Sequence, residues 1–370
     1  MTWERDTLDR VISKYRATAP LAAKLDALPY LGGPAGWQEP IFEGRAWWTN
    51  GFWPAIMWLG YAVGKDAFFL REARRAQAVI LPVMHDYYGT SHDLGFMYLL
   101  SCGADYKLTG DHDALRETLL AANLLAGRFN PAGFIRAWNG KGREGWMIVD
   151  SMMNLALLYS ASKLTGDPRY AAIARAHADT TSLCAVREDG SCHHIVCFDP
   201  YTGRVLSTPA GQGCAQGSSW SRGQAWALYG FTLSYLHTMD RRYLYTANRI
   251  ADYFISQIRE DGLTSCDFRQ GADEDLVDNI AGACAASGLI ELSRAGGDSK
   301  YMQAALRLLH GIDAHSADYD TGSCGILTRC TAAYSSSGPD REGRIIYGDY
   351  FYLEALCKLN GLDPMLWSLG

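Results

Sequence analysis

Residues 146–179, WMIVDSMMNLALLYSASKLTGDPRYAAIARAHAD, contain the unit from which most of the chain is predicted to be built. A nearly uncharged apolar segment starts after Asp150, Gly166 and Asp167 mark a turn, and a segment carrying arginines follows. Glycine suits the left-handed residue that ends a helix, and the aspartate after it can cap the next helix. The stretch therefore predicts a hairpin with a buried first helix and an amphipathic second helix.

The same helix–turn–helix unit recurs along the chain. Residues 110–111 and 297–298 repeat the Gly-Asp turn, and the opening segment near residues 3–29 is expected to pair with the last helix. The inner helices are expected to start near residues 51, 93, 150, 220, 278 and 348. Six inner helices surrounded by six outer ones make an all-α fold, an (α/α)6 barrel. We expect residues 1–370 to form one (α/α)6 catalytic domain.

Composition restricts the classes of function. The 370 residues carry a net charge of −6 and contain no run of five or more Lys or Arg. Because nucleic-acid binding needs a basic surface, no nucleic-acid partner is expected. The N-terminus has no apolar signal-peptide core and no uncharged apolar run reaches about 18 residues, so no membrane association is expected. The ten cysteines are scattered without a Cys-x-x-Cys pair, which predicts free thiols and a cytoplasmic location.

Parallel inner helices would bring their N-terminal ends to one rim of the barrel. Asp93 and Asp150 would lie there, together with Trp138 and Trp146 from the loop before Asp150. An aspartate in the first turn of a helix is usually a cap, and this is the interpretation given to residues 278 and 349. Tryptophan rings stack on sugar faces, and paired carboxylates perform glycoside chemistry. The rim therefore indicates a glycan-processing site.

Several blocks share a pattern in matching order: WTNGFW at 48–53, SHDLGFM at 91–97, FIRAW at 134–138, DSMMN at 150–154, WSRGQAW at 220–226 and YGDYFYLEAL at 347–356. From about residue 45 to the C-terminus the chain resembles the unsaturated glucuronyl hydrolases, glycoside hydrolase family 88. The resemblance implies an (α/α)6 barrel. It also implies a hydrolase that removes a 4,5-unsaturated uronic acid from the non-reducing end of oligosaccharides left by polysaccharide lyases.

The resemblance also implies roles for individual residues. By position, Asp150 is the general acid/base and Asp93 its partner carboxylate. The substrate-binding candidates are Trp48, Asn50, His92, Trp138, His194, Gln212, Trp220, Arg222, Trp226 and Tyr347. Gly211 departs from the family pattern, which has a histidine beside this glutamine. The expected partner is an unsaturated uronyl oligosaccharide, no cofactor or metal ion is expected, and the protein is predicted to be a monomer or homodimer.

The expected reaction needs a protonated acid. Protonation at C4 leaves positive charge at C5, water adds there, and the hemiketal opens to expel the remaining sugar chain. A free aspartate has a pKa of about 3.9. A helix N-terminus lowers this pKa by less than about one unit, whereas burial and a neighbouring carboxylate raise it. We therefore predict that Asp93 stays ionised and raises the pKa of Asp150, while the guanidinium of Arg222 binds the substrate carboxylate.

Other interpretations stay open. CHHIVC at residues 192–197 lacks zinc-ligand spacing, so no metal site is predicted there. No basic cluster near the loop at residues 335–341 favours heavily sulfated substrates. The alternatives are an unsaturated rhamnogalacturonyl hydrolase, against which Gln224-Ala225 argue, a sugar 2-epimerase that uses histidines, and a non-catalytic glycan-binding protein. An epimerase or a binding protein would leave the ultraviolet absorbance of the substrate double bond unchanged.

Overall fold

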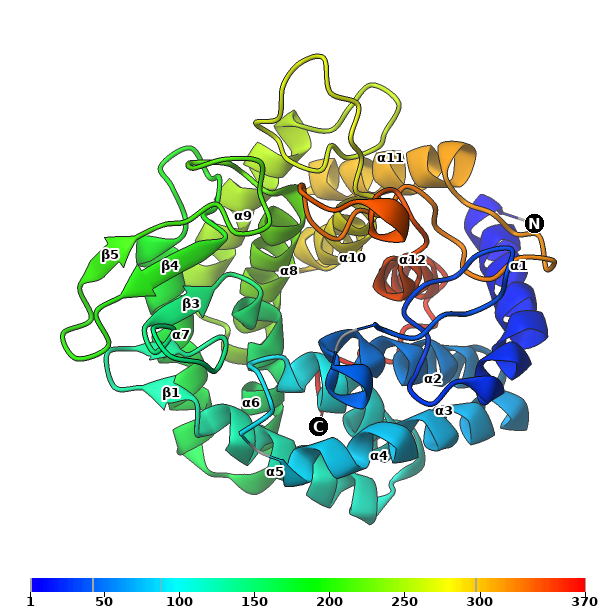
Figure 1. The fold of residues 1–370 in the computed structure, drawn as a ribbon, viewed down its shortest axis with the longest axis horizontal. Helices are drawn as coiled ribbons and strands as arrows, with labels where there is room; N and C mark the ends of the chain where they lie inside the picture. The colour runs from blue at the N-terminus through cyan, green and yellow to red at the C-terminus, as the bar shows by residue number, and fades with distance from the viewer. Residues whose placement is uncertain (1, 42, 87, 297, 370) are drawn as a thin grey trace.

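The fold is a closed ring of helical hairpins (Figure 1). The computed structural model describes residues 2–41, 43–86, 88–296 and 298–369. The inner ring consists of α2 (Phe52–Gly64), the π-helix Gly95–Gly103 continued by α4 (Ala104–Thr109), α6 (Ser151–Thr165), α8 (Ser221–Thr238), α10 (Asn279–Gly296) and α12 (Ile346–Leu359). Each contacts the next, and α12 returns to α2.

The outer ring consists of α3 (Ala67–Ile80), α5 (His112–Ala126), α7 (Pro168–Cys184), α9 (Arg241–Ser256), α11 (Ser299–His315) and α1 (Trp3–Thr18). Each outer helix packs on the inner helix of its own hairpin, and α1 packs on α12. The predicted (α/α)6 barrel and the pairing of the first segment with the last helix are therefore confirmed.

Burial follows the composition of the two rings. In α8, residues 221–235 are all buried, because small and aromatic side chains pack on every side. In α9, the buried residues recur at every third or fourth position, including Tyr243, Ala247, Ile250 and Phe254, while charged residues face outward. This is the spacing of a helix with one apolar face.

Aspartates start the outer helices. The side chains of five of them accept a backbone N–H from the first turn: Asp66, Asp111, Asp167, Asp240 and Asp298. Gly110 and Gly166 precede two of these caps with φ of +78° and +73°, as the Gly-Asp turns predicted. Gly297, in the third predicted turn, lies outside the described residues.

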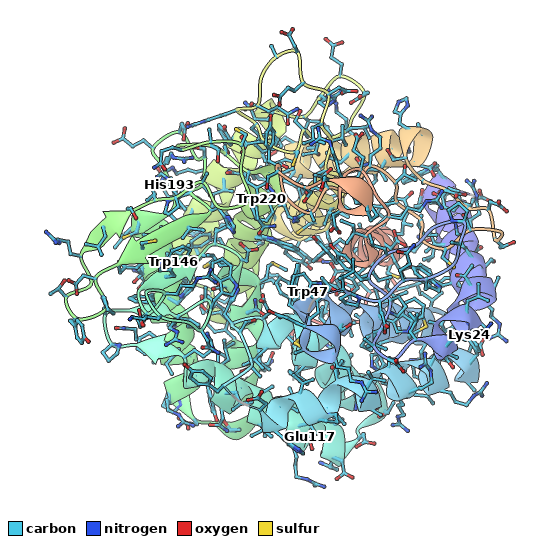
Figure 2. All side chains as sticks on the ribbon, in the orientation of Figure 1. Lys24, Trp47, Glu117, Trp146, His193 and Trp220 are labelled. Atoms are coloured by element: carbon cyan, nitrogen blue, oxygen red, sulfur yellow. The ribbon has the colours of Figure 1, made fainter. Side chains whose placement is uncertain are left out.

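Two small sheets, which the sequence analysis did not predict, are inserted on the rim. β1 (Phe129–Asn130) pairs with β2 (Phe134–Ile135). β3 (Trp146–Ile148), β4 (Ile195–Phe198) and β5 (Val205–Ser207) form an antiparallel sheet at the left of Figure 1. Because β3 ends just before residue 150 and β4 starts just after residue 194, their pairing brings these two positions together. Figure 2 shows Trp146 over this sheet and Trp47 near the middle of the ring.

Within the described residues, every helix is too short or too polar to cross a lipid bilayer.

Candidate active site

A cavity of about 390 Å³ lies at the N-terminal ends of the inner helices. Its lining includes Trp48 before α2, Asp93 before the π-helix, Asp150 before α6 and Tyr347 in the first turn of α12. The rings of Trp48 and Tyr347 lie 4.9 Å apart. The inner helices therefore share one direction, and their starts build one site, as the sequence analysis predicted.

Most of the predicted site residues meet at this cavity. The lining includes Trp48, His92, Asp93, Trp138, Asp150, Gln212 and Tyr347. His194 lines an adjoining cavity of about 350 Å³, to which Trp138 and Gln212 also contribute. A larger cavity of about 490 Å³ lies beside α5, but neither Asp93 nor Asp150 lines it. The site is therefore assigned to the smaller, central cavity.

Three predicted substrate contacts are buried in the described structure. Asn50 is fully buried and donates its side-chain N–H to the carbonyl oxygen of Gly44 at 2.8 Å. Trp226 is fully buried in the aromatic core, and its ring centre lies 5.2 Å from that of Phe96. Trp220 is buried behind His194, with ring centres 4.6 Å apart. None of the three is among the residues that line the two cavities, so their role in substrate binding stays a prediction.

Arg222, which was predicted to bind the substrate carboxylate, forms a buried ion pair. Arg222 is 1 % exposed, and its Nη1 lies 2.7 Å from Asp278 Oδ2 and 2.7 Å from the carbonyl oxygen of Thr331. Its Nη2 donates to the carbonyl oxygen of Ala332. Only its Nε is recorded without a partner among the described residues. Both terminal nitrogens of the guanidinium that was predicted to bind the substrate carboxylate are therefore hydrogen-bonded within the protein.

Asp93 is a buried carboxylate with few donors. Ser91 Oγ donates to its Oδ2 at 2.8 Å, and Asn154 Nδ2 lies 3.5 Å from its Oδ1. His92 Nε2 lies 3.3 Å from Oδ2, but burial lowers the pKa of His92 to about 3 and so keeps this imidazole neutral. Burial raises the pKa of Asp93 to about 7; Asp150 adds to this rise, and the hydrogen bond from Ser91 opposes it.

Asp150 occupies the N-cap position of α6, yet its side chain accepts no capping hydrogen bond from the described backbone. His194 Nε2 lies 3.3 Å from Asp150 Oδ1, although the two atoms are not aligned for a good hydrogen bond. The backbone N–H of Gln212 donates to His194 Nδ1 at 3.0 Å, so a neutral His194 carries its proton on Nε2, towards Asp150. Burial raises the pKa of Asp150, but His194, His92 and Arg222 together outweigh it and hold this pKa below its usual value.

These opposite pKa shifts favour Asp93 as the protonated member of the pair in the ligand-free protein. The sequence analysis predicted an ionised Asp93 and a protonated Asp150, and the directions of the two pKa shifts favour the opposite order. The physical reason is the placement of His194 next to Asp150, which follows from the pairing of β3 with β4. The expectation that the two carboxylates differ in proton affinity agrees with these directions, because both burial and the charge of Asp150 raise the pKa of Asp93.

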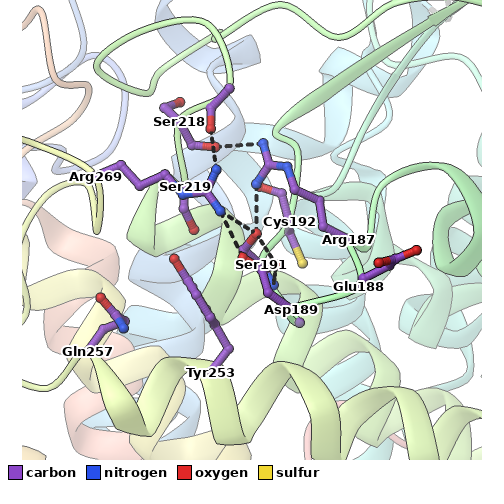
Figure 3. A network of polar contacts seen from close by, with 12 residues as sticks. Arg187, Glu188, Asp189, Ser191, Cys192, Ser218, Ser219, Tyr253, Gln257 and Arg269 are labelled. Carbon is purple, nitrogen blue, oxygen red and sulfur yellow. Dashed lines mark hydrogen bonds and ion pairs between the residues drawn. The ribbon is translucent and has the colours of Figure 1, made fainter.

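A partly exposed polar network holds the loop that precedes His194 (Figure 3). Arg187 donates to Ser191 Oγ at 2.9 Å and to the carbonyl oxygen of Ser218 at 2.8 Å. Arg269 donates to Asp189 at 2.9 Å. Below them, Gln224 Oε1 accepts the backbone N–H of Cys192 at 2.8 Å. These bonds hold the backbone on the N-terminal side of His194, and the hydrogen bond from Gln212 holds its imidazole.

The structure adds residues that the sequence analysis missed. Asn154 approaches both Asp93 and the carbonyl oxygen of Asp150, at 3.5 and 3.4 Å, and it stands in the conspicuous DSMMN block. Glu43 is a third carboxylate on the cavity, and burial followed by the charge of Asp93 raises its pKa. No motif surrounds Glu43, so its place on the cavity follows only from the fold.

Within the described chain, no group of three or more His, Cys, Asp or Glu side chains is arranged to hold a metal ion.

Comparison with known proteins assigns the family. The model of glycosyl hydrolase family 88 matches residues 35–338. The unsaturated glucuronyl hydrolase of Bacillus sp. (strain GL1) is 34 % identical over 345 residues, covering 90 % of this chain and 91 % of the relative. The unsaturated chondroitin disaccharide hydrolase of Streptococcus pneumoniae is 34 % identical over 332 residues, covering 86 % and 83 %. The crystal structure of the Bacillus sp. GL1 enzyme superposes with a TM-score of 0.90 over 99 % of each chain at 31 % identity. This chain belongs to glycosyl hydrolase family 88.

Proposed function

We propose that this chain is an unsaturated glucuronyl hydrolase. It removes a 4,5-unsaturated uronic acid from the non-reducing end of lyase-generated oligosaccharides, such as glycosaminoglycan disaccharides. The observation that carries the proposal is a pair of buried, weakly hydrogen-bonded aspartates facing one tryptophan-rimmed cavity in a family 88 barrel. The names of the relatives support this substrate class, and nothing in the comparisons supports the rhamnogalacturonyl, epimerase or glycan-binding alternatives.

In the proposed reaction, Asp150 delivers a proton to C4 of the unsaturated ring. The positive charge that develops at C5 is shared with the ring oxygen, and a water molecule adds at C5. Asp150, now ionised, accepts the proton that this water gives up. The hemiketal then opens and releases the rest of the sugar chain. The reaction involves no attack at the anomeric carbon, so the carboxylate spacing rules of ordinary glycosidases do not apply.

Asp93 supplies the proton that Asp150 needs. Asp150 has a lowered pKa in the free protein, whereas Asp93 holds a proton up to about pH 7. A bound uronate brings a further negative charge into the cavity, which raises the proton affinity of Asp150. Transfer of the proton from Asp93 to Asp150 then makes Asp150 able to act as the acid. Asn154 contacts both Asp93 and the backbone of Asp150 and so helps to hold the two residues in position relative to each other.

The proposal is tested with lyase-generated unsaturated disaccharides. Hydration at C5 destroys the conjugated double bond, so incubation with the protein is expected to abolish its ultraviolet absorbance at the rate of sugar release. The Asp150→Asn variant serves as the matched control. An unchanged absorbance with every disaccharide, measured on folded protein, would contradict the proposal and favour an epimerase or a binding protein.

The remaining expectations concern the protein as a whole. A cytoplasmic location is supported by the ten cysteines, which lie in the described residues as free thiols. The continuous ring of hairpins supports a single catalytic domain over residues 1–370. That the protein is a monomer or homodimer, without a nucleic-acid partner, stays a prediction.

A further inference from the structure

Arg143 is an exposed cation beside the catalytic cavity. Its guanidinium carbon lies 5.9 Å from the ring centre of Trp138 and 5.5 Å from that of Trp146. Its side chain makes cation–π contacts with these two rings, and no carboxylate of the described chain forms an ion pair with it. Its N–H donors are therefore available to a ligand, and the two rings orient the guanidinium plane.

Arg143 lines two cavities at once. One is the catalytic cavity with Asp93 and Asp150, and the other is the adjoining cavity of about 350 Å³. Trp138 and Gln212 also line both, whereas Trp146 lines the second. A disaccharide whose unsaturated ring occupies the first cavity can continue over Trp138 into the second. The tryptophan rings there offer flat apolar faces to the next sugar ring.

Gly211 keeps part of the second cavity open. Its φ is +62°, and a Cβ at this position would lie only 2.0 Å from His194 Nδ1. Because the polar network and Gln212 hold His194 in place, the structure accepts no side chain at position 211. Gly211 and Arg143 line the same cavity, and the glycine adds no side chain to it.

We propose that the second cavity binds the leaving sugar and that Arg143 contacts an anionic substituent on that sugar, a sulfate ester or a carboxylate. This inference rests on the proposed hydrolase function. A guanidinium fork matches two oxygens of either group. Arg143 is then a specificity-determining residue, which favours substrates with a charged leaving sugar. The sequence analysis looked for a cluster of basic residues and found none. The proposed anion contact is instead a single arginine that lies over two tryptophan rings.

The test compares charged and uncharged leaving sugars. kcat/KM is measured from absorbance loss for unsaturated disaccharides ending in unsulfated, 4-sulfated or 6-sulfated N-acetylgalactosamine, and for unsaturated digalacturonate. For each charged substrate, kcat/KM is divided by the value for the unsulfated disaccharide, in wild type and in Arg143→Gln. We expect the variant to lower this ratio about tenfold for at least one charged substrate; dividing by the value for the unsulfated disaccharide removes any effect of the substitution on turnover in general.

Lys141 provides the matched control. It is exposed on the same loop but is not among the described lining residues of either cavity, so Lys141→Gln is expected to leave the ratio unchanged. A fall confined to the sulfated disaccharides identifies a sulfate ester, and a fall confined to digalacturonate identifies a carboxylate. An unchanged ratio in Arg143→Gln, or an equal fall in Lys141→Gln, overturns the inference. Absence of wild-type turnover with all four substrates instead defeats the proposed function, and the inference with it.

Discussion

Two pairs of aspartates occupy equivalent places on the inner ring and differ in their surroundings. Asp93 and Asp150 face the central cavity, whereas Asp278 and Asp349 lie on the other side of the ring. All four stand at or near the start of an inner helix and are at most 7 % exposed. Asp278 binds Arg222 and accepts two backbone N–H groups, from Ile280 and Thr331.

Asp349 is also well supplied with donors. It accepts the backbone N–H groups of Ile326 and Leu327 at 2.7 and 2.8 Å and the hydroxyl of Tyr15 at 2.5 Å. It anchors a loop and is not the simple helix cap that the sequence analysis expected. Burial of a carboxylate is costly unless donors compensate it. Asp278 and Asp349 each accept at least three hydrogen bonds from described donors. Asp93 accepts one short and one long hydrogen bond, and Asp150 Oδ1 accepts none from the described residues, so the two aspartates on the cavity are held by fewer hydrogen bonds.

Asp150→Asn is expected to give the largest effect. An amide cannot deliver a proton to C4, so kcat should fall by about a thousandfold or more, within the range of general acid–base catalysis. Because Asp150 caps no helix in the described structure, the melting temperature should stay close to that of wild type. Absorbance loss and thermal unfolding measured on the same sample check both halves of this statement.

Asp278→Ala is expected to act on stability. It leaves the guanidinium of Arg222 buried and unpaired, which typically costs about 3–5 kcal/mol. Urea unfolding measures the loss. A variant that keeps wild-type stability would show that Asp278 does not compensate Arg222, and the contrast between the two pairs would fail.

Asp93→Asn should reduce kcat by roughly a hundredfold and move the pH optimum towards acid. Without Asp93, Asp150 must take its proton from solvent, and its lowered pKa makes this possible only at lower pH. A pH–rate profile measured from absorbance loss checks this prediction. An optimum that moves towards alkali would refute the proton-source role.

The same variant is expected to change the pH dependence of stability by a smaller amount. Asp93 holds its proton up to about pH 7 in the folded protein, whereas an aspartate in the unfolded chain releases it near about pH 3.9. Between these values the folded state binds more protons, so this group lowers stability as the pH rises, by at most about 1.4 kcal/mol per pH unit. Urea unfolding of Asp93→Asn at pH 5, 6 and 7 should therefore show a shallower decline than wild type.

Much of the fold could be predicted from local signals. Gly-Asp turns and the contrast between uncharged and amphipathic segments depend on neighbouring residues, so the hairpins and the shared rim followed from them. Asp93, Asp150, Trp48 and Trp138 line one cavity, which could be expected because each lies at or just before the start of an inner helix, or in a loop at that rim.

Other features depend on contacts between distant residues. Arg222 is paired with Asp278, which is 56 positions away, and nothing in either local sequence indicates this. The order of the two pKa values depends on His194, which strands of only three and four residues bring to Asp150. Strands this short lack a readable alternation, so the small sheet and its electrostatic consequence could not be predicted.

The most direct test is infrared difference spectroscopy of the ligand-free protein as the pH is raised through 7. The C=O stretch of a protonated carboxyl group is separate from that of a carboxylate and reports which aspartate carries the proton. We predict that wild type shows a protonated-carboxyl band that disappears as the pH passes through this range and that Asp93→Asn lacks it. Asp150→Asn should keep the band but lose it at a somewhat lower pH, because the charge of Asp150 no longer raises the pKa of Asp93. A band that persists in Asp93→Asn and vanishes in Asp150→Asn would contradict the account, because the proton would then reside on Asp150.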